Sequence, residues 1–162
     1  MKIPVVQEFM VTSLVTLRPD MPIYEAIEVL LRSRISGACV VDAEKNLLGI
    51  LSEKDCLRIF AGGALHQLPN AMVADYMSKI VSTVGPDEDL FTVAGTFLKN
   101  TFRRIPVVED GKLIGQVSRR DVLEGSRKIW GETLFAEKPW TDSKYIPEQV
   151  KAALETKPRT SA

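Results

Sequence analysis

The sequence contains one pattern twice, and this internal repeat is the feature that most limits how the chain can fold. The number of positions between matched residues of the two copies is constant before one predicted turn, and it is one smaller after that turn. A separation that changes only at a turn indicates two copies of a single structural unit. The matched positions are Met10 and Met77, Thr16 and Thr83, Pro19-Asp20 and Pro86-Asp87, Val40-Val41 and Val107-Val108, Gly49 and Gly115, Ser52 and Ser118, and Asp55 and Asp121.

Each copy has the predicted order β-α-β-β-α. A short β-like segment, 15–17 or 82–84, precedes a Pro-Asp pair and a helix, and we expect Asp87 to cap the helix of the second copy. Apolar residues of that helix recur at i, i+3, i+4, i+7 and i+8, which is typical of one buried face. These residues are Ile23, Ala26, Ile27, Leu30 and Leu31 in the first copy and Leu90, Val93, Ala94, Phe97 and Leu98 in the second.

A β-hairpin and a second helix complete each copy. In the second copy, Asp110-Gly111 separates the apolar runs 105–108 and 113–117. This dipeptide favours a type I′ turn, because both central residues of that turn need a positive φ. The first copy has one extra residue in its turn, 43–46. The last helices are predicted to begin at about Glu53 and about Arg119, each just after a serine that can cap it.

One copy is too small to bury its apolar faces well, so the two copies are expected to pack together. We predict an α/β (α+β) fold in which two pseudo-symmetric motifs pack sheet to sheet. The expected boundaries are 1–65 for the first motif, 66–72 for a linker and 73–130 for the second motif. Residues 131–162 are expected to form a C-terminal tail that can hold a short helix over 148–155.

Composition argues against several classes of partner. The 21 Lys and Arg residues balance 21 Asp and Glu residues, whereas a nucleic-acid-binding protein usually carries a clustered basic excess. No apolar run is long enough to span a membrane, and the N-terminus has no signal-peptide core, so we expect a cytoplasmic protein. Cys39, Cys56 and His66 lie in no metal or redox spacing, so no metal site is expected.

Over about residues 6–129 the chain resembles a tandem pair of CBS domains, often called a Bateman module. The resemblance rests on 73–77, on Thr16 and Thr83, on 104–108, and on two Gly-x-x-Ser-x-x-Asp motifs at 49–55 and 115–121. It implies a regulatory module that binds an adenosine-containing ligand (AMP, ADP or ATP) in the cleft between the motifs. It also implies a homodimer formed through the motifs and a separate regulated protein that responds to ligand occupancy.

The two Ser-x-x-Asp motifs have two interpretations. A carboxylate at a helix N-terminus can accept hydrogen bonds from both ribose hydroxyls, and the resemblance favours that role for Asp55 and Asp121. The same spacing is a short capping box, in which Ser52 or Ser118 caps the helix and the acid bonds back to the cap. Capping alone explains either motif.

Arginines make the second copy the better equipped for a phosphate. Arg103 and Arg104 precede a strand expected to face the cleft, where guanidinium groups can hold phosphate oxygens. Arg119 and Arg120 add positive charge at the same end. The matching residues of the first copy, Ser36-Gly37, carry no charge. The alternative is that these arginines are solvated surface residues.

The resemblance assigns further contacts to the strands. Thr16 and Thr83 can offer hydroxyl groups, although β-branched residues are also ordinary in strands. The segments Ala38-Cys39 and Ile105-Pro106 are expected to contact the adenine, and Cys39 stands where many family members have proline. The predicted nucleotide-binding residues are Thr16, Ser36, Gly37, Ala38, Ser52, Asp55, Thr83, Arg103, Arg104, Ile105, Pro106, Ser118, Arg119, Arg120 and Asp121.

Other functions are weighed against this one. The same fold can serve as a ligand-free scaffold for dimerisation, or it can bind S-adenosylmethionine or a dinucleotide. An enzyme is not expected, because the chain has no Walker-type loop and no carboxylate cluster suited to two metals. We therefore predict no catalytic residues, and an adenine nucleotide as a regulatory ligand rather than a catalytic cofactor.

Overall fold

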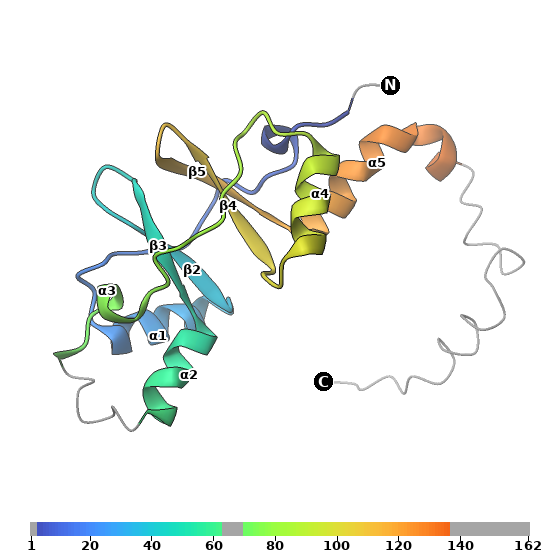
Figure 1. Cartoon of the computed structure of the whole chain (residues 1–162). Coiled ribbons are helices and arrows are strands. Elements are labelled where there is room, and N and C mark those ends of the chain that lie inside the picture. Colours follow the sequence, from blue (N-terminus) through green and yellow to red (C-terminus); the bar gives the residue numbers. More distant parts are fainter. Residues whose placement is uncertain (1–2, 63–69, 137–162) are drawn as a thin grey trace, which may run out of the picture.

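The computed structural model describes residues 3–62 and 70–136, with side chains up to residue 129. It contains two sheets, one with the order β1-β2-β3 and one with the order β4-β5 (Figure 1). The elements are a 3₁₀ helix (Val6–Glu8), β1 (Thr16–Leu17), α1 (Ile23–Ser33), β2 (Gly37–Val41), β3 (Leu47–Ser52), α2 (Glu53–Ala61), α3 (Val73–Tyr76), α4 (Leu90–Lys99), β4 (Arg104–Glu109), β5 (Lys112–Ser118) and α5 (Arg119–Ala136).

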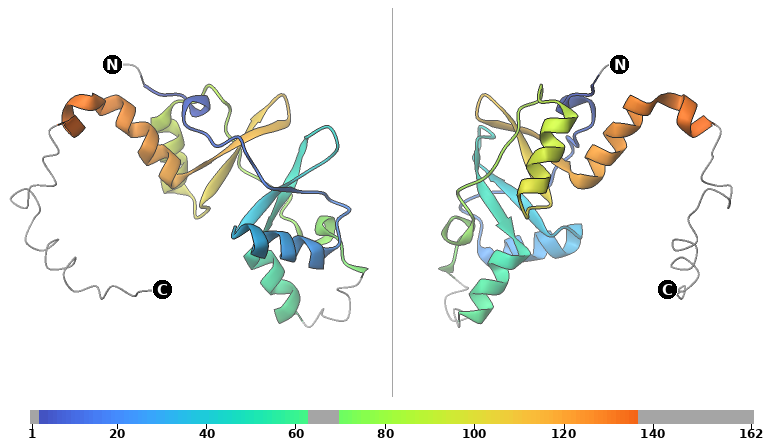
Figure 2. Two further views of the ribbon diagram at one scale, coloured as in Figure 1. Left: turned by 180° about the vertical axis from the view of Figure 1, so that it is seen from behind. Right: turned by 45° about the vertical axis from the view of Figure 1, so that its right-hand side comes forward.

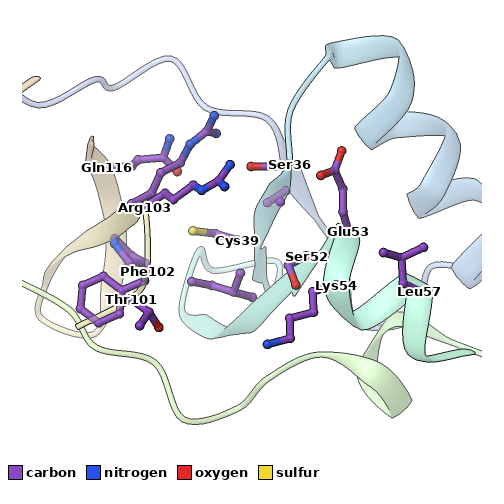
Figure 3. A pocket seen from close by; sticks show the side chains of 15 residues that line it. Ser36, Cys39, Ser52, Glu53, Lys54, Leu57, Thr101, Phe102, Arg103 and Gln116 are labelled. Carbon is purple, nitrogen blue, oxygen red and sulfur yellow. The ribbon is translucent and has the colours of Figure 1, made fainter. Parts of the chain in front are cut away.

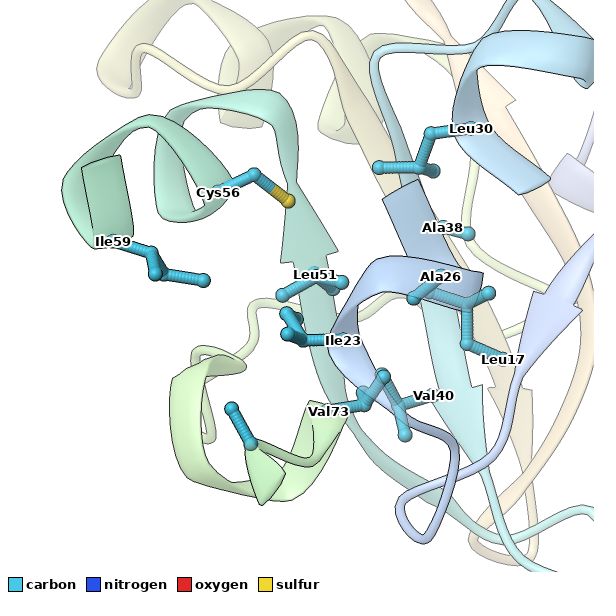
Figure 4. Close-up of a cluster of buried hydrophobic side chains, with 11 residues drawn as sticks. Leu17, Ile23, Ala26, Leu30, Ala38, Val40, Leu51, Cys56, Ile59 and Val73 are labelled. Atoms are coloured by element: carbon cyan, nitrogen blue, oxygen red, sulfur yellow. The ribbon is translucent and has the colours of Figure 1, made fainter. Parts of the chain in front are cut away.

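The first repeat packs α1 and α2 against a three-stranded sheet. Strand β1 pairs with β2 in parallel, and β2 pairs with β3 as an antiparallel hairpin. The core joins Leu17 and Leu51 from the strands to Ile23 from α1 and Ile59 from α2, all of them almost completely buried (Figure 4). The predicted helix stripe is therefore buried in large part, but Leu31 at its end lies exposed.

The second repeat has the same plan with a weaker first strand. The expected strand over 82–84 is reduced to one parallel bridge between Val84 and Val107. Helices α4 and α5 pack with the β4-β5 hairpin around a second core. Its buried members are Val6, Val84, Leu90, Val93, Phe97, Ile105, Val107, Val117 and Val122.

The cap of α4 is Asp89, so the prediction of Asp87 was wrong. The Asp89 carboxylate accepts hydrogen bonds from the backbone N–H groups of Phe91 (2.9 Å) and Thr92 (3.1 Å). A helix beginning at Leu90 needs its acceptor at the preceding residue, because the side chain must reach the second and third helical N–H groups. Asp87 instead accepts a hydrogen bond from the Gln7 side chain.

The hairpins match the prediction closely. Asp110 and Gly111 have φ angles of +50° and +80°, as a type I′ turn requires. Both hairpins also shift register at the same repeat position, between Val40 and Val41 and between Val107 and Val108. A shared irregularity of this kind is what two copies of one unit should show.

The segments that precede the repeats are exchanged between them. We call residues 3–11 and 71–78 the leading segments. Residues 3–11 lie on the second repeat, where Val11 and Gln116 exchange two backbone hydrogen bonds of 2.9 Å. Residues 71–78 lie on the first repeat, where Ile50 and Ser78 exchange two such bonds. Figures 1 and 2 show the N-terminal segment beside α4 and helix α3 beside α1.

A small apolar cluster joins the two sheets. Its buried members are Cys39 and Val41 from β2 and Leu113 from β5. The hairpin turns are also hydrogen-bonded to each other, since the Leu113 N–H donates to the Lys45 carbonyl at 2.9 Å. The predicted α+β fold with two β-α-β-β-α motifs packed together is thereby confirmed.

The described residues leave parts of the domain prediction open. Helix α5 continues to Ala136, past the boundary expected at residue 130. Most of the expected linker and the short helix expected over 148–155 lie outside the described residues. Within the ranges 3–62 and 70–136, no helix has the length and hydropathy needed to cross a membrane.

Candidate functional site

A cavity of about 590 Å³ lies between the two repeats (Figure 3). This volume is in the range of pockets that hold small-molecule ligands and cofactors. The first repeat contributes the start of β2, the end of β3 and the first turns of α2, and the second contributes the start of β4, the loop before it and one residue of β5. The lining residues are Ser36, Gly37, Ala38, Cys39, Ile50, Ser52, Glu53, Lys54, Leu57, Thr101, Phe102, Arg103, Arg104, Pro106 and Gln116.

Repeat-equivalent residues face each other across this cavity. Both members of four pairs line it: Ser36 and Arg103, Gly37 and Arg104, Cys39 and Pro106, and Ile50 and Gln116. The cavity therefore straddles the pseudo-twofold axis that relates the repeats. A ligand bound here touches both repeats at once. The unlike members of each pair make the two walls chemically different, because one wall carries two arginines where the other carries serine and glycine.

The inner wall of the cavity is apolar. Ala38, Cys39 and Pro106 are buried, and Phe102 is half-buried at the edge. Burial raises the pKa of the Cys39 thiol to about 11, although the positive charge of Arg104 acts in the opposite direction. The thiol is therefore protonated at neutral pH and packs as a small apolar side chain. Such a wall suits the face of a flat aromatic ring.

The rim of the cavity is positively charged. Arg103, Arg104 and Lys54 line it together with a single acid, Glu53. Among the described residues, no carboxylate lies within ion-pair distance of these three cations. Figure 3 shows Arg103 on one side of the cavity and Lys54 and Ser52 on the other. Unpaired cations converging on a partly apolar cavity favour an anionic ligand.

The other two arginines of the predicted site are engaged elsewhere. Arg119 donates to the backbone carbonyl of Phe102 at 3.2 Å, and Arg120 pairs with Glu124 at 2.9 Å. Neither lines the cavity. Arg119 thus supports the loop that carries Phe102, just before the two arginines of the rim.

Both Ser-x-x-Asp motifs form capping boxes. The Asp55 carboxylate accepts from the Ser52 N–H at 2.9 Å, and the Ser52 hydroxyl oxygen accepts from the Asp55 N–H at 3.3 Å. Ser118 and Asp121 repeat this geometry at 2.7 and 3.3 Å. Ser52 lines the cavity, but neither aspartate does. The capping interpretation is therefore present in the geometry, and the ribose contact stays a prediction.

Removing the Asp55 carboxylate is expected to destabilise the first repeat. The side chain is only 6% exposed and also accepts a hydrogen bond from Arg58 at 3.2 Å. We expect Asp55→Ala to lower the free energy of unfolding by about 1–2 kcal/mol, because the Ser52 N–H and hydroxyl lose the carboxylate that accepts their hydrogen bonds. Urea unfolding followed by circular dichroism measures this effect, and an unchanged midpoint would contradict the capping role.

The milder Asp55→Asn variant separates the two roles of this residue. Asparagine keeps an oxygen that can accept from the Ser52 N–H, so a folded protein is expected. A loss of AMP affinity of about tenfold in that variant would support the ribose contact. An unchanged affinity would leave Asp55 with its capping role alone.

Three further predicted residues lie outside this cavity. Thr16 lines a second cavity, Thr83 is exposed in a loop, and Ile105 is buried in the second core. The cavity thus unites Ser36, Gly37, Ala38, Ser52, Arg103, Arg104 and Pro106 from the predicted set, and it does not include Thr16, Asp55, Thr83, Ile105, Ser118, Arg119, Arg120 or Asp121.

Sequence reasoning missed several residues that line the cavity. Gln116 and Ile50 carry a usable signal, because they occupy equivalent positions of the two repeats, on β5 and β3. Lys54 and Glu53 are the counterparts of Arg120 and Arg119 and could have been added by the same logic. Leu57, Thr101 and Phe102 carry no such signal. The described residues hold no group of three or more His, Cys, Asp or Glu side chains suited to a metal ion.

Comparison with known proteins identifies both halves of the chain. The family model of the CBS domain matches residues 6–62 and residues 73–128. An uncharacterised Methanocaldococcus jannaschii protein, MJ1225, is 34% identical over 126 residues, which cover 77% of this chain and 44% of that protein. The chloroplastic protein CBSX1 of Arabidopsis thaliana is 28% identical over 138 residues, covering 69% of this chain and 58% of CBSX1. The chain thus spans about half the length of these relatives.

Solved structures show the same fold. The crystal structure of CBSX2 in complex with AMP has a TM-score of 0.69 and 29% sequence identity, covering 78% of this chain and 98% of that one. The structure of CBSX2 from Arabidopsis thaliana described as a CBS-pair protein has a TM-score of 0.71 and 28% identity, with 80% and 98% covered.

Proposed function

This chain belongs to the CBS domain family as a tandem pair, and from that premise we propose that it is a regulatory module that binds AMP or a related adenosine phosphate. The ligand occupies the cavity between the repeats, and its presence is signalled to a partner protein. The observation that carries this proposal is the set of unpaired cations, Arg103, Arg104 and Lys54, on the rim of a cavity with an apolar wall. The complex of CBSX2 with AMP supports it.

The two parts of the cavity suit the two ends of such a ligand. The wall formed by Ala38, Cys39 and Pro106 accepts an adenine ring by apolar contact. The guanidinium groups of Arg103 and Arg104 can each form paired hydrogen bonds with phosphate oxygens. Lys54 adds a point charge from the first turn of α2, whose backbone dipole also favours an anion.

Signalling follows from the position of the cavity. The ligand contacts both repeats, so occupancy favours the arrangement in which both walls fit it. The two repeats are joined by the Cys39, Val41 and Leu113 cluster and by the exchanged leading segments. A change in their relative angle is the output that a partner protein can read. The function is regulatory rather than catalytic in this proposal.

Titration calorimetry with AMP, ADP, ATP, adenosine and S-adenosylmethionine tests the proposal. AMP is expected to bind at least about 100-fold more tightly than adenosine, because each of the two arginines adds a charge-assisted hydrogen bond worth about 1.5–3 kcal/mol. A ligand at about 100 times its Kd also adds about 2.7 kcal/mol of stability, which thermal unfolding detects. Equal affinities for AMP and adenosine would contradict the role of the cations, and no binding by any of the five would favour a ligand-free scaffold.

Exposed apolar residues also favour a homodimer, which is the second element of the proposal. Three repeat-equivalent pairs lie exposed on the helices: Tyr24 and Phe91, Leu31 and Leu98, and Leu57 and Leu123. Leu31 and Leu98 are 62% and 89% exposed. Because the pairs follow the pseudo-twofold axis, each repeat presents a similar apolar patch. A second copy presents the same two patches and so offers a matching surface.

Charges placed on these patches should separate the dimer. We expect sedimentation to give twice the chain mass for the natural protein and the single chain mass for Leu31→Glu/Leu98→Glu, because a dimer would bury the new carboxylates. Ile80→Glu is the control, since Ile80 is fully exposed and lies in a loop rather than on one of these helices. A natural protein that sediments as a monomer, or a double variant that remains dimeric, would contradict this interface.

A further inference from the structure

A second cavity lies at the turn end of the two hairpins. It measures about 430 Å³ and is separate in its lining residues from the cavity described above. Strands β2 and β5, one hairpin turn and the segment leading into β1 form its walls. The lining residues are Thr12, Leu14, Thr16, Val41, Lys45, Lys112, Leu113 and Ile114.

The fold brings one lysine from each hairpin into this cavity. Lys45 lies in the turn of the first hairpin, and Lys112 is the first residue of β5, just after the turn of the second. The turns are tied together by the Leu113 N–H to Lys45 carbonyl bond (2.9 Å) and by the Leu47 N–H to Gly111 carbonyl bond (3.2 Å). Both lysines are thus anchored on backbone that the opposite hairpin holds in place. Two ammonium groups sharing one cavity repel each other, and an anion between them removes that cost.

No ion pair joins either lysine to a carboxylate of the described hairpin turns. Among the described residues, no carboxylate lies within ion-pair distance of Lys45 or Lys112. Lys112 has a weak electrostatic effect on Asp42. The pKa of Asp42 is lowered mainly by a hydrogen bond from the Asn46 side chain and to a smaller extent by the charge of Lys112. The Asp42 oxygens already accept bonds from Asn46 (2.7 and 2.8 Å) and from the Glu44 N–H (3.0 Å).

The floor of the cavity is apolar. Leu14, Val41, Leu113 and Ile114 line it, and Val41 and Leu113 belong to the buried cluster that joins the sheets. The hydroxyl groups of Thr12 and Thr16 add hydrogen-bonding capacity at the sides. An apolar surface with a few convergent polar and charged groups is the usual composition of a small-molecule site.

We propose that this cavity is a second ligand site, which binds a small organic anion with an apolar body and a phosphate or carboxylate group. The anionic group lies between Lys45 and Lys112, and the body covers Leu113 and Val41. The site is independent of the proposed nucleotide site, with which it shares no lining residue. Its ligand is smaller than a nucleotide, in keeping with the smaller volume.

Site-resolved NMR titration tests the proposal on the full chain. The probes are phenyl phosphate, phenylacetate and inorganic phosphate, and the backbone amide signals of residues 45–47 and 112–114 are followed. We expect saturable shifts with phenyl phosphate or phenylacetate, and the tighter of the two identifies the anionic group. Lys45→Gln/Lys112→Gln is expected to weaken that binding about tenfold or more, as loss of a charged hydrogen bond does. Inorganic phosphate should bind more weakly, because it lacks the apolar body.

Two control variants keep this test separate from the nucleotide site. Lys79→Gln/Lys99→Gln removes the same charge from exposed lysines that line neither cavity, and it should leave probe affinity within about twofold. Arg103→Gln/Arg104→Gln should affect AMP but not the probes. Absence of saturable shifts, equal loss in the Lys79/Lys99 control, or equal affinity for inorganic phosphate would each overturn the proposal, whatever the result with AMP.

Discussion

Replacing Arg103 and Arg104 together with glutamine is expected to weaken AMP binding about 100-fold or more. A hydrogen bond to a charged group contributes about 1.5–3 kcal/mol, and each arginine supplies at least one to the phosphate in the proposed complex. Both line the cavity and neither has an ion-pair partner among the described residues. The substitutions therefore break no described ion pair inside the protein, and the loss of AMP affinity should report the lost contacts with the phosphate. Titration calorimetry at fixed ionic strength measures it.

The same variant should leave adenosine binding almost unchanged. Adenosine lacks the phosphate, so its affinity reports the apolar wall alone. The matched control is Arg18→Gln/Arg32→Gln, which removes two arginines from exposed ion pairs with Asp20 and Glu28, and neither of these arginines lines the cavity. Parallel losses for AMP and adenosine, or a similar loss in the control, would refute the assignment of the phosphate to this rim.

Gly49→Ala should cause a large loss of stability. A Cβ atom at this position would lie 2.7 Å from the Ser78 carbonyl oxygen and 2.9 Å from the Met77 sulfur. The carbonyl cannot move away freely, because it accepts the Ile50 N–H at 3.0 Å in the contact that holds the leading segment. We expect a decrease of about 2–3 kcal/mol in the free energy of unfolding, the upper part of the range for overpacked sites.

Two other glycines provide the comparison. At Gly115 the nearest atom is the Met10 sulfur, the end of a flexible side chain, with the Val11 carbonyl 3.1 Å away, so the loss for Gly115→Ala should be smaller. Gly95 lies within α4 with nothing within 4 Å, and Gly95→Ala should stabilise by about 0.5–1 kcal/mol. Urea unfolding of the three variants ranks them by stability, with Gly95→Ala expected to be the most stable and Gly49→Ala the least. A Gly49→Ala midpoint equal to that of the natural protein would contradict this ranking.

The internal repeat made most of the fold predictable. The structure differs from the prediction in the first strand of the second repeat and in the exchange of the leading segments. Matched spacing and helix periodicity predicted two β-α-β-β-α units, and Asp110-Gly111 predicted its turn. The first strand of the second repeat is reduced to a single bridge at Val84, and the next backbone N–H along the chain, that of Gly85, donates to the Glu88 side chain at 2.8 Å instead of to a strand. The exchange of leading segments was not predicted, because both segments have similar sequences and nothing local indicates which repeat each contacts.

The candidate site was predictable only in part for a related reason. Arg103, Arg104 and the 36–38 segment could be found from charge and from the repeat, and they do line one cavity. The Ser-x-x-Asp motif could not separate capping from ligand binding, because both use a carboxylate at a helix start. Leu57, Thr101 and Phe102 line the cavity because one repeat packs against the other, and the sequence of a single repeat does not reveal that packing.

Because the leading segments are exchanged, each repeat is completed by a segment that belongs to the other repeat. A single repeat would lack the segment that bonds to its hairpin, and its own leading segment would have no hairpin to bond to. It could regain these contacts only by exchanging leading segments with a second copy of itself. In the tandem chain the two repeats supply these segments to each other. Because both repeats belong to one chain, they need not be identical, and one wall of the shared cavity can carry arginines where the other carries serine and glycine.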